Sequence, residues 1–280
     1  MKRVLLFGAG QVGAMTARLL GTEYRALCFA DNMKSKWGGS LLGLPILSPE
    51  EGLALEPDCA VLCVLDGERA AQMEEQLRAL GFAGELMRPD GLRRFDVRVG
   101  TMRLLAEQLN ALAVLGDVAE LGVYRGDFAA LLCAAFPDRR IHLFDTFEGF
   151  SERDLAPERS LSLSRAKAGD FSETGVELVR AALPPGAKAV FHPGWFPESF
   201  RGCEEERFAF VSVDPDLYAP TAAALPLFFD RLSPGGVLLI HDVNSGQFSG
   251  PGKAVAEFCA RRGLLPLPLC DLHGSVVIRK

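Results

Sequence analysis

The sequence predicts an α/β protein with two Rossmann-like domains, a small one at residues 1–99 and a larger one at 100–280. The chain has 280 residues, more than one typical domain of about 150 residues would need. A strand, a glycine-rich turn and a helix follow one another twice, near residues 4–20 and 117–136. With 49% hydrophobic and 24% charged residues, the composition excludes a disordered chain.

Charge and cysteine content exclude several classes of function. The net charge of −6 is spread over both parts of the chain, which argues against a nucleic-acid-binding platform. The seven cysteines never form a C-x-x-C pair, a pattern that favours reduced core thiols in the cytoplasm over disulfides or a zinc site. The apolar run at residues 4–7 is too short for a signal peptide, so we expect a cytoplasmic protein without a membrane segment.

The first strand, turn and helix carry a glycine pattern typical of dinucleotide-binding domains. Its glycines are Gly8, Gly10 and Gly13. They would allow a tight turn, close approach of the backbone to a pyrophosphate, and close packing of the helix on the strand. The next strand, residues 25–30, ends at Asp31, where a carboxylate would meet ribose hydroxyls. We therefore expect a nucleotide site here, with a purely structural turn as the alternative.

The rest of the first domain limits its chemistry. Strands are expected at 45–47, 59–65 and 85–87, and a helix at 68–80. This is too short for a complete dinucleotide-binding domain, and no Tyr precedes a Lys by four positions, so an NAD(P)-dependent oxidoreductase is a weaker alternative. The segment 29–49 resembles the small Rossmann domains of bacterial polysaccharide-biosynthesis proteins. That resemblance covers residues 3–90 and implies a nucleotide sugar or NAD(P) as ligand.

A group of arginines follows the first domain. It consists of Arg88, Arg93, Arg94, Arg98 and Arg103. Little apolar periodicity accompanies these residues before a helix expected at 102–112. A solvated connector between the domains is therefore a better interpretation than a phosphate-binding patch.

The second strand, turn and helix unit predicts a different ligand. Its strand leads through Glu120 and Gly122 into the turn, and the next strand ends at Asp145. A carboxylate at that strand end would hold ribose hydroxyls. Glu120 lies where a phosphate-binding turn would avoid negative charge. We therefore expect a cationic nucleoside without phosphates, such as S-adenosylmethionine (SAM).

Five motifs in the larger domain resemble the macrocin O-methyltransferase family. They lie, in family order, at 119–126, 142–150, 194–198, 211–218 and 233–242, within residues 112–280. The resemblance implies a seven-stranded class I SAM-dependent methyltransferase fold. It implies methylation of a hydroxyl of a sugar or glycoside in polysaccharide or natural-product biosynthesis. The residues that it implies for SAM are Glu120, Gly122, Tyr124, Asp145, Thr146, Gly194 and Trp195.

Acidic residues at two strand ends suggest how the hydroxyl would react. Asp214 follows the strand at 208–213, and Asp242 follows the strand at 237–240. The family resemblance implies Mg²⁺, with Asp214 and Asp242 as ligands and Asp216 in support; Asp214 is also a candidate base. His241 stands where relatives carry a second acid, and imidazole is a poor Mg²⁺ ligand. His241 is therefore a candidate base, an acceptor-stabilising group, or the companion of Mn²⁺.

Some alternatives stay open at this point. The replacement of an acid by histidine allows a non-catalytic SAM- or nucleotide-binding scaffold as the second interpretation. The polar segment 151–171 shows no clear periodicity and is expected to be a mobile lid over the acceptor. A helix at 254–262 and strands at 265–269 and 274–278 would complete the fold. The expected partner is a small saccharide or glycoside, and a homo-oligomer is left open.

Overall fold

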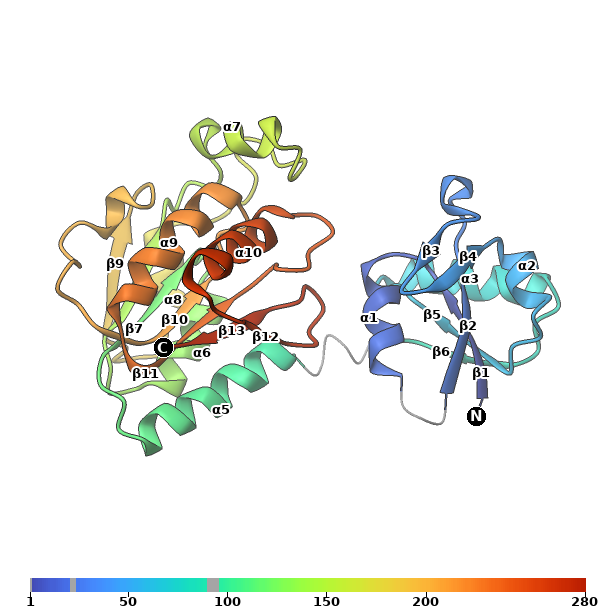
Figure 1. Ribbon diagram of the computed structural model, residues 1–280, viewed down its shortest axis with the longest axis horizontal. Coiled ribbons are helices and arrows are strands. Elements are labelled where there is room, and N and C mark those ends of the chain that lie inside the picture. Colours follow the sequence, from blue (N-terminus) through green and yellow to red (C-terminus); the bar gives the residue numbers. More distant parts are fainter. Residues whose placement is uncertain (1, 21–23, 90–95) are drawn as a thin grey trace. The chain divides into compact units, whose positions relative to one another are not determined.

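A computed structural model describes residues 2–20, 24–89 and 96–280 (Figure 1). The chain divides into two compact α/β units. Unit 1 is Met1–Asp96 with Cys270–Leu272, and unit 2 is Val97–Leu269 with His273–Lys280. The sequence-based boundary was placed between residues 99 and 100. Two of the clustered arginines, Arg93 and Arg94, lie outside the described residues.

Unit 1 is built on a six-stranded sheet in the order β3-β4-β2-β1-β5-β6. The strands are β1 (Lys2–Phe7), β2 (Tyr24–Ala30), β3 (Ser40–Leu41), β4 (Leu44–Leu47), β5 (Cys59–Leu62) and β6 (Glu85–Met87). Its helices are α1 (Gln11–Leu19), α2 (Pro49–Leu53) and α3 (Gly67–Ala79), with a short 3-10 helix η1 (Lys34–Lys36). All strand pairs are parallel except β3 with β4. The apolar run of β1 is buried because helices cover both faces of a parallel sheet.

The glycine turn of unit 1 has a clear steric requirement. A Cβ added at Gly13 would lie 2.0 Å from the carbonyl oxygen of Gly8, so only glycine lets α1 approach the turn this closely. Gly8 itself has φ +117°, a conformation that other residues rarely adopt. A Cβ at Gly10 would meet nothing within 4 Å, so packing does not explain that glycine.

Unit 2 contains a seven-stranded sheet in the order β12-β13-β11-β10-β7-β8-β9. The strands are β7 (Asp117–Leu121), β8 (Ile141–Asp145), β9 (Ala189–Pro193), β10 (Phe208–Val213), β11 (Leu232–Ile240), β12 (Leu267–Pro268) and β13 (Val276–Arg279). The five strands from β7 to β11 run parallel, and β13 pairs antiparallel with both β11 and β12. The order reverses between β7 and β10, which is where open α/β sheets bind ligands.

Helices cover both faces of this sheet. They are α5 (Val97–Ala111), α6 (Asp127–Ala135), α7 (Glu152–Ser160), α8 (Val176–Ala182), α9 (Tyr218–Arg231) and α10 (Gly250–Arg262), with a 3-10 helix η2 (Glu198–Phe200). One core lies between the sheet and α9 and α10, and includes Phe144, Phe208 and Phe228. The other lies between the sheet and α5, α6 and α8, and includes Phe136 and Phe210 (Figure 1).

Two segments differ from the sequence-based expectation. Part of 151–171, where no periodicity predicts a helix, forms helix α7, and Leu155 of that helix is buried with Leu217 and Phe248. A single apolar anchor leaves no periodic pattern, which explains why the helix was missed. Helix α5 begins at Val97, earlier than the expected residue 102, and therefore includes Arg98.

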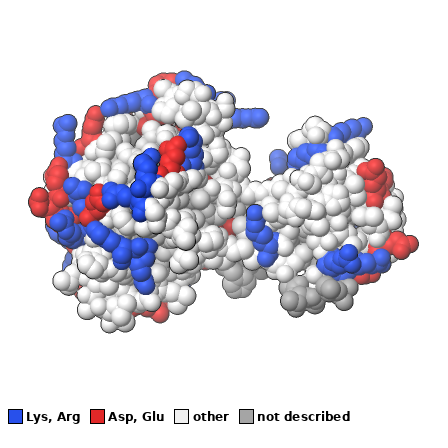
Figure 2. All heavy atoms as spheres, viewed as in Figure 1, with Lys and Arg blue, Asp and Glu red and all other residues white. Residues whose placement is uncertain are grey.

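On the face shown in Figure 2, basic and acidic side chains are interspersed. Among the described residues, no helix is long and apolar enough to cross a membrane.

Candidate active site

A cavity of about 300 Å³ lies in unit 2 at the carboxyl ends of β7, β8 and β10. The sequence-predicted residues that line it are Glu120, Gly122, Tyr124, Asp145, Thr146, Gly194, Trp195, Asp214, Asp216 and His241. Asp242 does not line this cavity but lies directly behind His241, 4% exposed. The structure therefore brings the predicted SAM-binding and catalytic residues of unit 2 together.

The turn after β7 fits its place only because it contains glycine. Gly122 has φ +85°, and a Cβ at this position would lie 2.1 Å from the carbonyl oxygen of Asp214. The Gly122 amide donates to Phe144, and the Asp214 amide donates to Leu121, at 3.0 and 2.8 Å. The turn thus sets the spacing between the ends of β7, β8 and β10.

Asp145 joins the end of β8 to this turn. Its carboxylate accepts hydrogen bonds from the amides of Val123, Tyr124 and Phe147, at 2.7, 3.0 and 2.8 Å. The described residues place no lysine or arginine on this carboxylate. Its charge is therefore met by backbone amides and by the hydroxyl of Thr146, at 3.4 Å, and it still lines the cavity.

Asp31 occupies the same position in unit 1, but its charge is compensated. It accepts from the amides of Ala9 and Met33, each at 2.8 Å, and it forms an ion pair with Lys36 at 2.8 Å. A ribose would have to compete with Lys36 for this carboxylate. Asp31 and Asp145 thus differ in their surroundings, because only Asp31 is paired with a lysine among the described residues. Binding of a nucleotide by unit 1 stays a prediction.

Glu120 is a buried acid without a full set of partners. It is 1% exposed, and its Oε2 atom has no hydrogen-bond partner among the described residues. Burial raises the pKa of Glu120 well above its usual range, and the charges of Asp214 and Asp145 add to this effect against the opposing charge of Arg98. A buried carboxyl that lines a cavity without a partner is suited to a cationic group.

Trp195 forms a wall of the cavity and is held by helix α7. Its indole nitrogen donates to Asp154, which is 6% exposed, and the guanidinium carbon of Arg153 lies 3.5 Å from the ring centroid. Such a cation–π contact fixes the plane of the ring. Helix α7 therefore contributes to the site from the segment that was expected to be a lid.

Arg98 is a site residue that the sequence analysis misassigned to a solvated connector. The side chain is buried, and its Nη1 atom donates to Oδ2 of Asp214 at 2.7 Å. The signal was present in the pattern of α5, because Arg98 shares one buried stripe with Met102, Ala106 and Leu109. A charged residue at a position of that stripe needs a buried partner.

The imidazole of His241 lies between two carboxylates. Its Nδ1 atom is 3.0 Å from Oδ1 of Asp214 and 3.2 Å from Oδ2 of Asp242. Burial alone would lower the pKa of His241, but these carboxylates outweigh it and raise the pKa to about 10. Burial would likewise raise the pKa of Asp214, yet Arg98 and His241 hold it well below its usual range.

Asp216 and Asp242 form a second acidic pair. Burial, the charge of Asp214 and a hydrogen bond to Asp242 raise the pKa of Asp216 well above its usual range. Both residues adopt left-handed backbone conformations, with φ of 59° and 57°, as does Tyr124 with 48°. Such strain in non-glycine residues is characteristic of functional sites.

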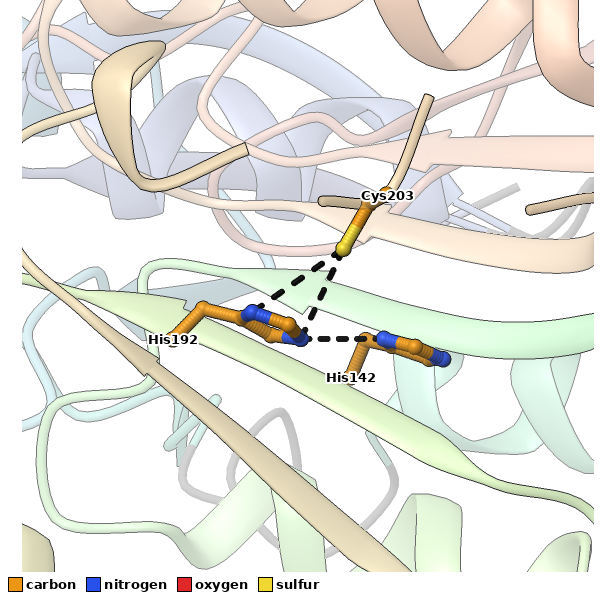
Figure 3. Close-up of side chains that lie close together, drawn as sticks. All are labelled: His142, His192 and Cys203. Atoms are coloured by element: carbon orange, nitrogen blue, oxygen red, sulfur yellow. Dashed lines mark hydrogen bonds between the residues drawn. The ribbon is translucent and has the colours of Figure 1, made fainter. Parts of the chain in front are cut away.

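A separate group of His142, His192 and Cys203 lies in the core, away from the cavity lining (Figure 3). Three potential ligands this close could suggest a metal site. However, Nδ1 of His142 and Nε2 of His192 point at each other 3.0 Å apart, as in a hydrogen bond, instead of converging on a common point. The geometry therefore indicates a hydrogen-bonded chain.

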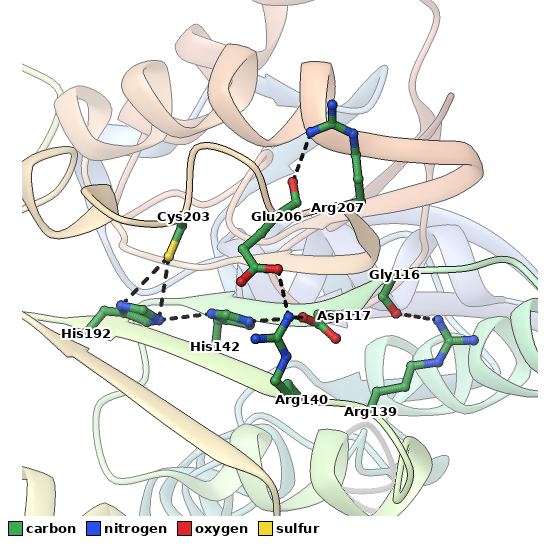
Figure 4. A network of polar contacts seen from close by, with 9 residues as sticks. All are labelled: Gly116, Asp117, Arg139, Arg140, His142, His192, Cys203, Glu206 and Arg207. Carbon is green, nitrogen blue, oxygen red and sulfur yellow. Dashed lines mark hydrogen bonds and ion pairs between the residues drawn. The ribbon is translucent and has the colours of Figure 1, made fainter.

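The direction of each hydrogen bond in this group follows from the residues at its two ends, Asp117 and Cys203. Asp117 lies 3.3 Å from Nε2 of His142 and also pairs with Arg140 at 2.6 Å (Figure 4). A carboxylate can only accept, so His142 donates to Asp117 and His192 donates to His142. Burial and the neighbouring His142 lower the pKa of His192 to about 4, consistent with a neutral ring. The Cys203 thiol, 3.9 Å from Nδ1 of His192, is the last member of this hydrogen-bonded series.

Comparison with known proteins identifies unit 2. Residues 91–279 match the model of the Macrocin-O-methyltransferase (TylF) family. The 8-demethyl-8-(2,3-dimethoxy-alpha-L-rhamnosyl)-tetracenomycin-C 4'-O-methyltransferase of Streptomyces olivaceus is 31% identical, over 67% of this chain and 72% of that protein. The Mycinamicin III 3''-O-methyltransferase of Micromonospora griseorubida is 29% identical, over 54% of this chain and 63% of that protein.

A solved structure agrees with these sequence relatives. The O-methyltransferase NovP is 25% identical and superposes with a TM-score of 0.56, over 65% of this chain and 79% of that chain. The family match at residues 91–279 covers the strands of the seven-stranded sheet and the residues that line the cavity described above. This chain therefore belongs to the macrocin O-methyltransferase family and is a SAM-dependent O-methyltransferase.

Proposed function

We propose that the chain methylates a hydroxyl group of a sugar or glycoside, with SAM as methyl donor. The observation that carries this proposal is the cavity in which Glu120, a buried acid whose Oε2 atom has no partner among the described residues, lies near a strand-end carboxylate, Asp145. Glu120 would bind the positively charged methionine end of SAM, and Asp145 would accept from its ribose hydroxyls. Both relatives named above are O-methyltransferases by name, and the substrate name of the Streptomyces olivaceus protein includes a rhamnosyl group, which supports a sugar-bearing acceptor here.

His241 is the group that would receive the acceptor's proton. Its Nδ1 atom faces the carboxylates of Asp214 and Asp242, which leaves Nε2 as the nitrogen that can accept. The acceptor oxygen would attack the methyl carbon of SAM, the carbon–sulfur bond would break, and S-adenosylhomocysteine would leave. The hydroxyl proton would pass to Nε2, and the two carboxylates would stabilise the imidazolium. Asp214 thus supports the base rather than acting as the base.

Aromatic rings form the acceptor side of the cavity. Phe171 packs against Tyr124 and Phe150, with ring centroids 5.3 and 5.1 Å apart, and all three rings line the cavity. Phe248 lies against the same group. Such a wall suits the C–H face of a sugar or an apolar aglycone better than a highly charged acceptor.

The test combines ligand binding with a search for the acceptor. Calorimetry should detect S-adenosylhomocysteine, and Asp145→Asn should weaken its binding by about 100-fold, because the ribose loses a charged acceptor. Transfer of labelled methyl from SAM to a panel of glycosides should then yield a sugar O-methyl product. Binding without transfer to any hydroxylated acceptor would favour the scaffold alternative, and absence of binding would refute the proposal.

Glu120→Gln should weaken SAM binding by about 10–100-fold, the effect of losing one charged hydrogen bond. The free carboxyl has a raised pKa and must ionise to hold a cation, so wild-type SAM affinity should increase with pH until that pKa is passed. The variant should lose this dependence. Calorimetry at several pH values measures both effects.

Glu148→Gln is the matched control, because Glu148 is exposed and does not line the cavity. It should bind SAM as the wild type does. Equal affinities of the Glu120 variant and the wild type would show that Glu120 does not contact the cation.

A further inference from the structure

The two carboxylates implied as Mg²⁺ ligands, Asp214 and Asp242, share their surroundings with the imidazole of His241. Mg²⁺ binds oxygen ligands at about 2.0–2.1 Å in octahedral geometry. An ion held by both Asp214 and Asp242 would have to lie between their carboxylates. Nδ1 of His241 lies 3.0 Å from one carboxylate and 3.2 Å from the other, so the three side chains are close enough together to face one ion. An imidazole nitrogen is a poor ligand for Mg²⁺, and a protonated imidazole would repel it. The residues present therefore do not fit Mg²⁺.

The other oxygen of Asp214 is bound by a permanent cation. Arg98 donates to Oδ2 at 2.7 Å, and the guanidinium group keeps its charge at any physiological pH. A divalent ion on the same carboxylate would lie within a few ångströms of this charge and would be repelled. Asp214 is thus engaged on one side by Arg98 and on the other by His241.

Arg98 is fixed in this position by neighbouring elements. Its Nη2 atom donates to Ser212 at 3.1 Å, and its guanidinium carbon lies 4.0 Å from the ring centroid of Phe128. Ser212 is fully buried in β10, and Arg98 is 8% exposed. Because Arg98 is buried, stacked on an aromatic ring and held by two hydrogen bonds, its position next to Asp214 is fixed by the fold.

We propose that the side chains of Arg98 and His241 occupy the place of a divalent cation, so that this methyltransferase site works without a metal. Arg98 is a positioning residue: it holds Asp214, which in turn orients His241 toward the acceptor. This inference rests on the proposed function for its meaning in catalysis. Its central claim concerns metal binding and is tested independently of methyl transfer.

The experiment is a titration of the full-length chain with Mn²⁺, in the presence of S-adenosylhomocysteine, followed by electron paramagnetic resonance and calorimetry. Wild type should show no saturable binding at the site. The double variant Arg98→Met with His241→Glu removes the built-in cation and adds an oxygen ligand. It should bind Mn²⁺ at least about tenfold more tightly than wild type.

Controls separate this effect from a general disturbance. Arg103→Met changes an exposed arginine of the same helix and should bind no more Mn²⁺ than wild type. Circular dichroism verifies folding of each variant. If the double variant does not fold, His241→Glu and Arg98→Lys are titrated singly, and His241→Glu should bind Mn²⁺ more tightly than Arg98→Lys, which keeps the positive charge.

Two results would overturn the inference. One is saturable binding of Mn²⁺ to wild type that Asp214→Asn abolishes. The other is a folded double variant without any gain in affinity. Once an acceptor is found, methyl transfer by wild type should also be unchanged by a chelator. A chain that binds no S-adenosylhomocysteine would refute the proposed function but would leave the metal titration readable.

Discussion

His241→Gln is expected to reduce the rate of methyl transfer by about 10²–10⁴-fold, the usual contribution of a general base. Glutamine keeps a polar side chain of similar reach but cannot take up the hydroxyl proton. Affinity for S-adenosylhomocysteine should stay within about twofold, because the ligand needs no proton transfer. Single-turnover transfer of labelled methyl and calorimetry measure the two quantities.

The same histidine predicts how the rate depends on pH. Only the neutral imidazole can accept a proton, and the raised pKa of about 10 makes this form scarce at neutral pH. The wild-type rate should therefore increase with pH until about pH 10 and then level off, whereas the residual rate of the glutamine variant should lack this rise.

His273→Gln is the matched control for His241. The two rings lie 5.3 Å apart, and His273 is also near Asp242, at 3.4 Å, but it does not line the cavity. This control should transfer methyl groups at nearly the wild-type rate. If His241→Gln retained full activity, another group would have to accept the proton.

Gly122→Ala is expected to lower the free energy of unfolding of unit 2 by about 3–5 kcal/mol. The added Cβ would lie 2.1 Å from the carbonyl oxygen of Asp214, and φ of +85° disfavours any side chain. Relief of the clash requires the ends of β7 and β10 to separate, which would also misplace Asp214. Urea denaturation followed by circular dichroism measures the loss, and calorimetry should show weakened SAM binding.

Gly186→Ala separates the clash from the backbone conformation. Gly186 has φ +82°, but a Cβ there would meet nothing within 4 Å. Its replacement should cost only about 1–2 kcal/mol, the usual penalty for a left-handed residue with a side chain. Equal losses in the two variants would mean that the close approach to Asp214 does not constrain the turn.

The sequence was most informative where a candidate functional residue comes at the end of a buried strand. The run at 208–213, apolar except for Ser212, predicts β10 with its observed bounds, and Asp214 comes immediately after it. The same logic applies to Glu120 in β7 and Asp145 at the end of β8. Because carboxyl ends of parallel strands meet at one edge, motifs far apart in the chain were correctly expected to share a cavity.

Residues whose role depends on tertiary partners could not be predicted in the same way. Arg98 lies between Val97 and Val99, and the spacing of α5 places it on the buried stripe of that helix, but its partner is defined only when α5 packs so that Arg98 reaches Asp214. The anchoring of α7 depends on one buried leucine, Leu155, which gives no periodic signal. Likewise, nothing in the sequence indicated that Lys36 would pair with Asp31.

The hydrogen bonds at Asp145 also bear on the energetics of ligand binding. The amides of Val123 and Tyr124 hold this carboxylate in place through hydrogen bonds within the protein. The conformational entropy lost in ordering the turn is therefore spent during folding and not when the nucleoside arrives. Such preorganisation lets a small number of polar contacts produce affinity. It also makes the turn a rigid reference for aligning the methyl carbon of SAM with the acceptor hydroxyl.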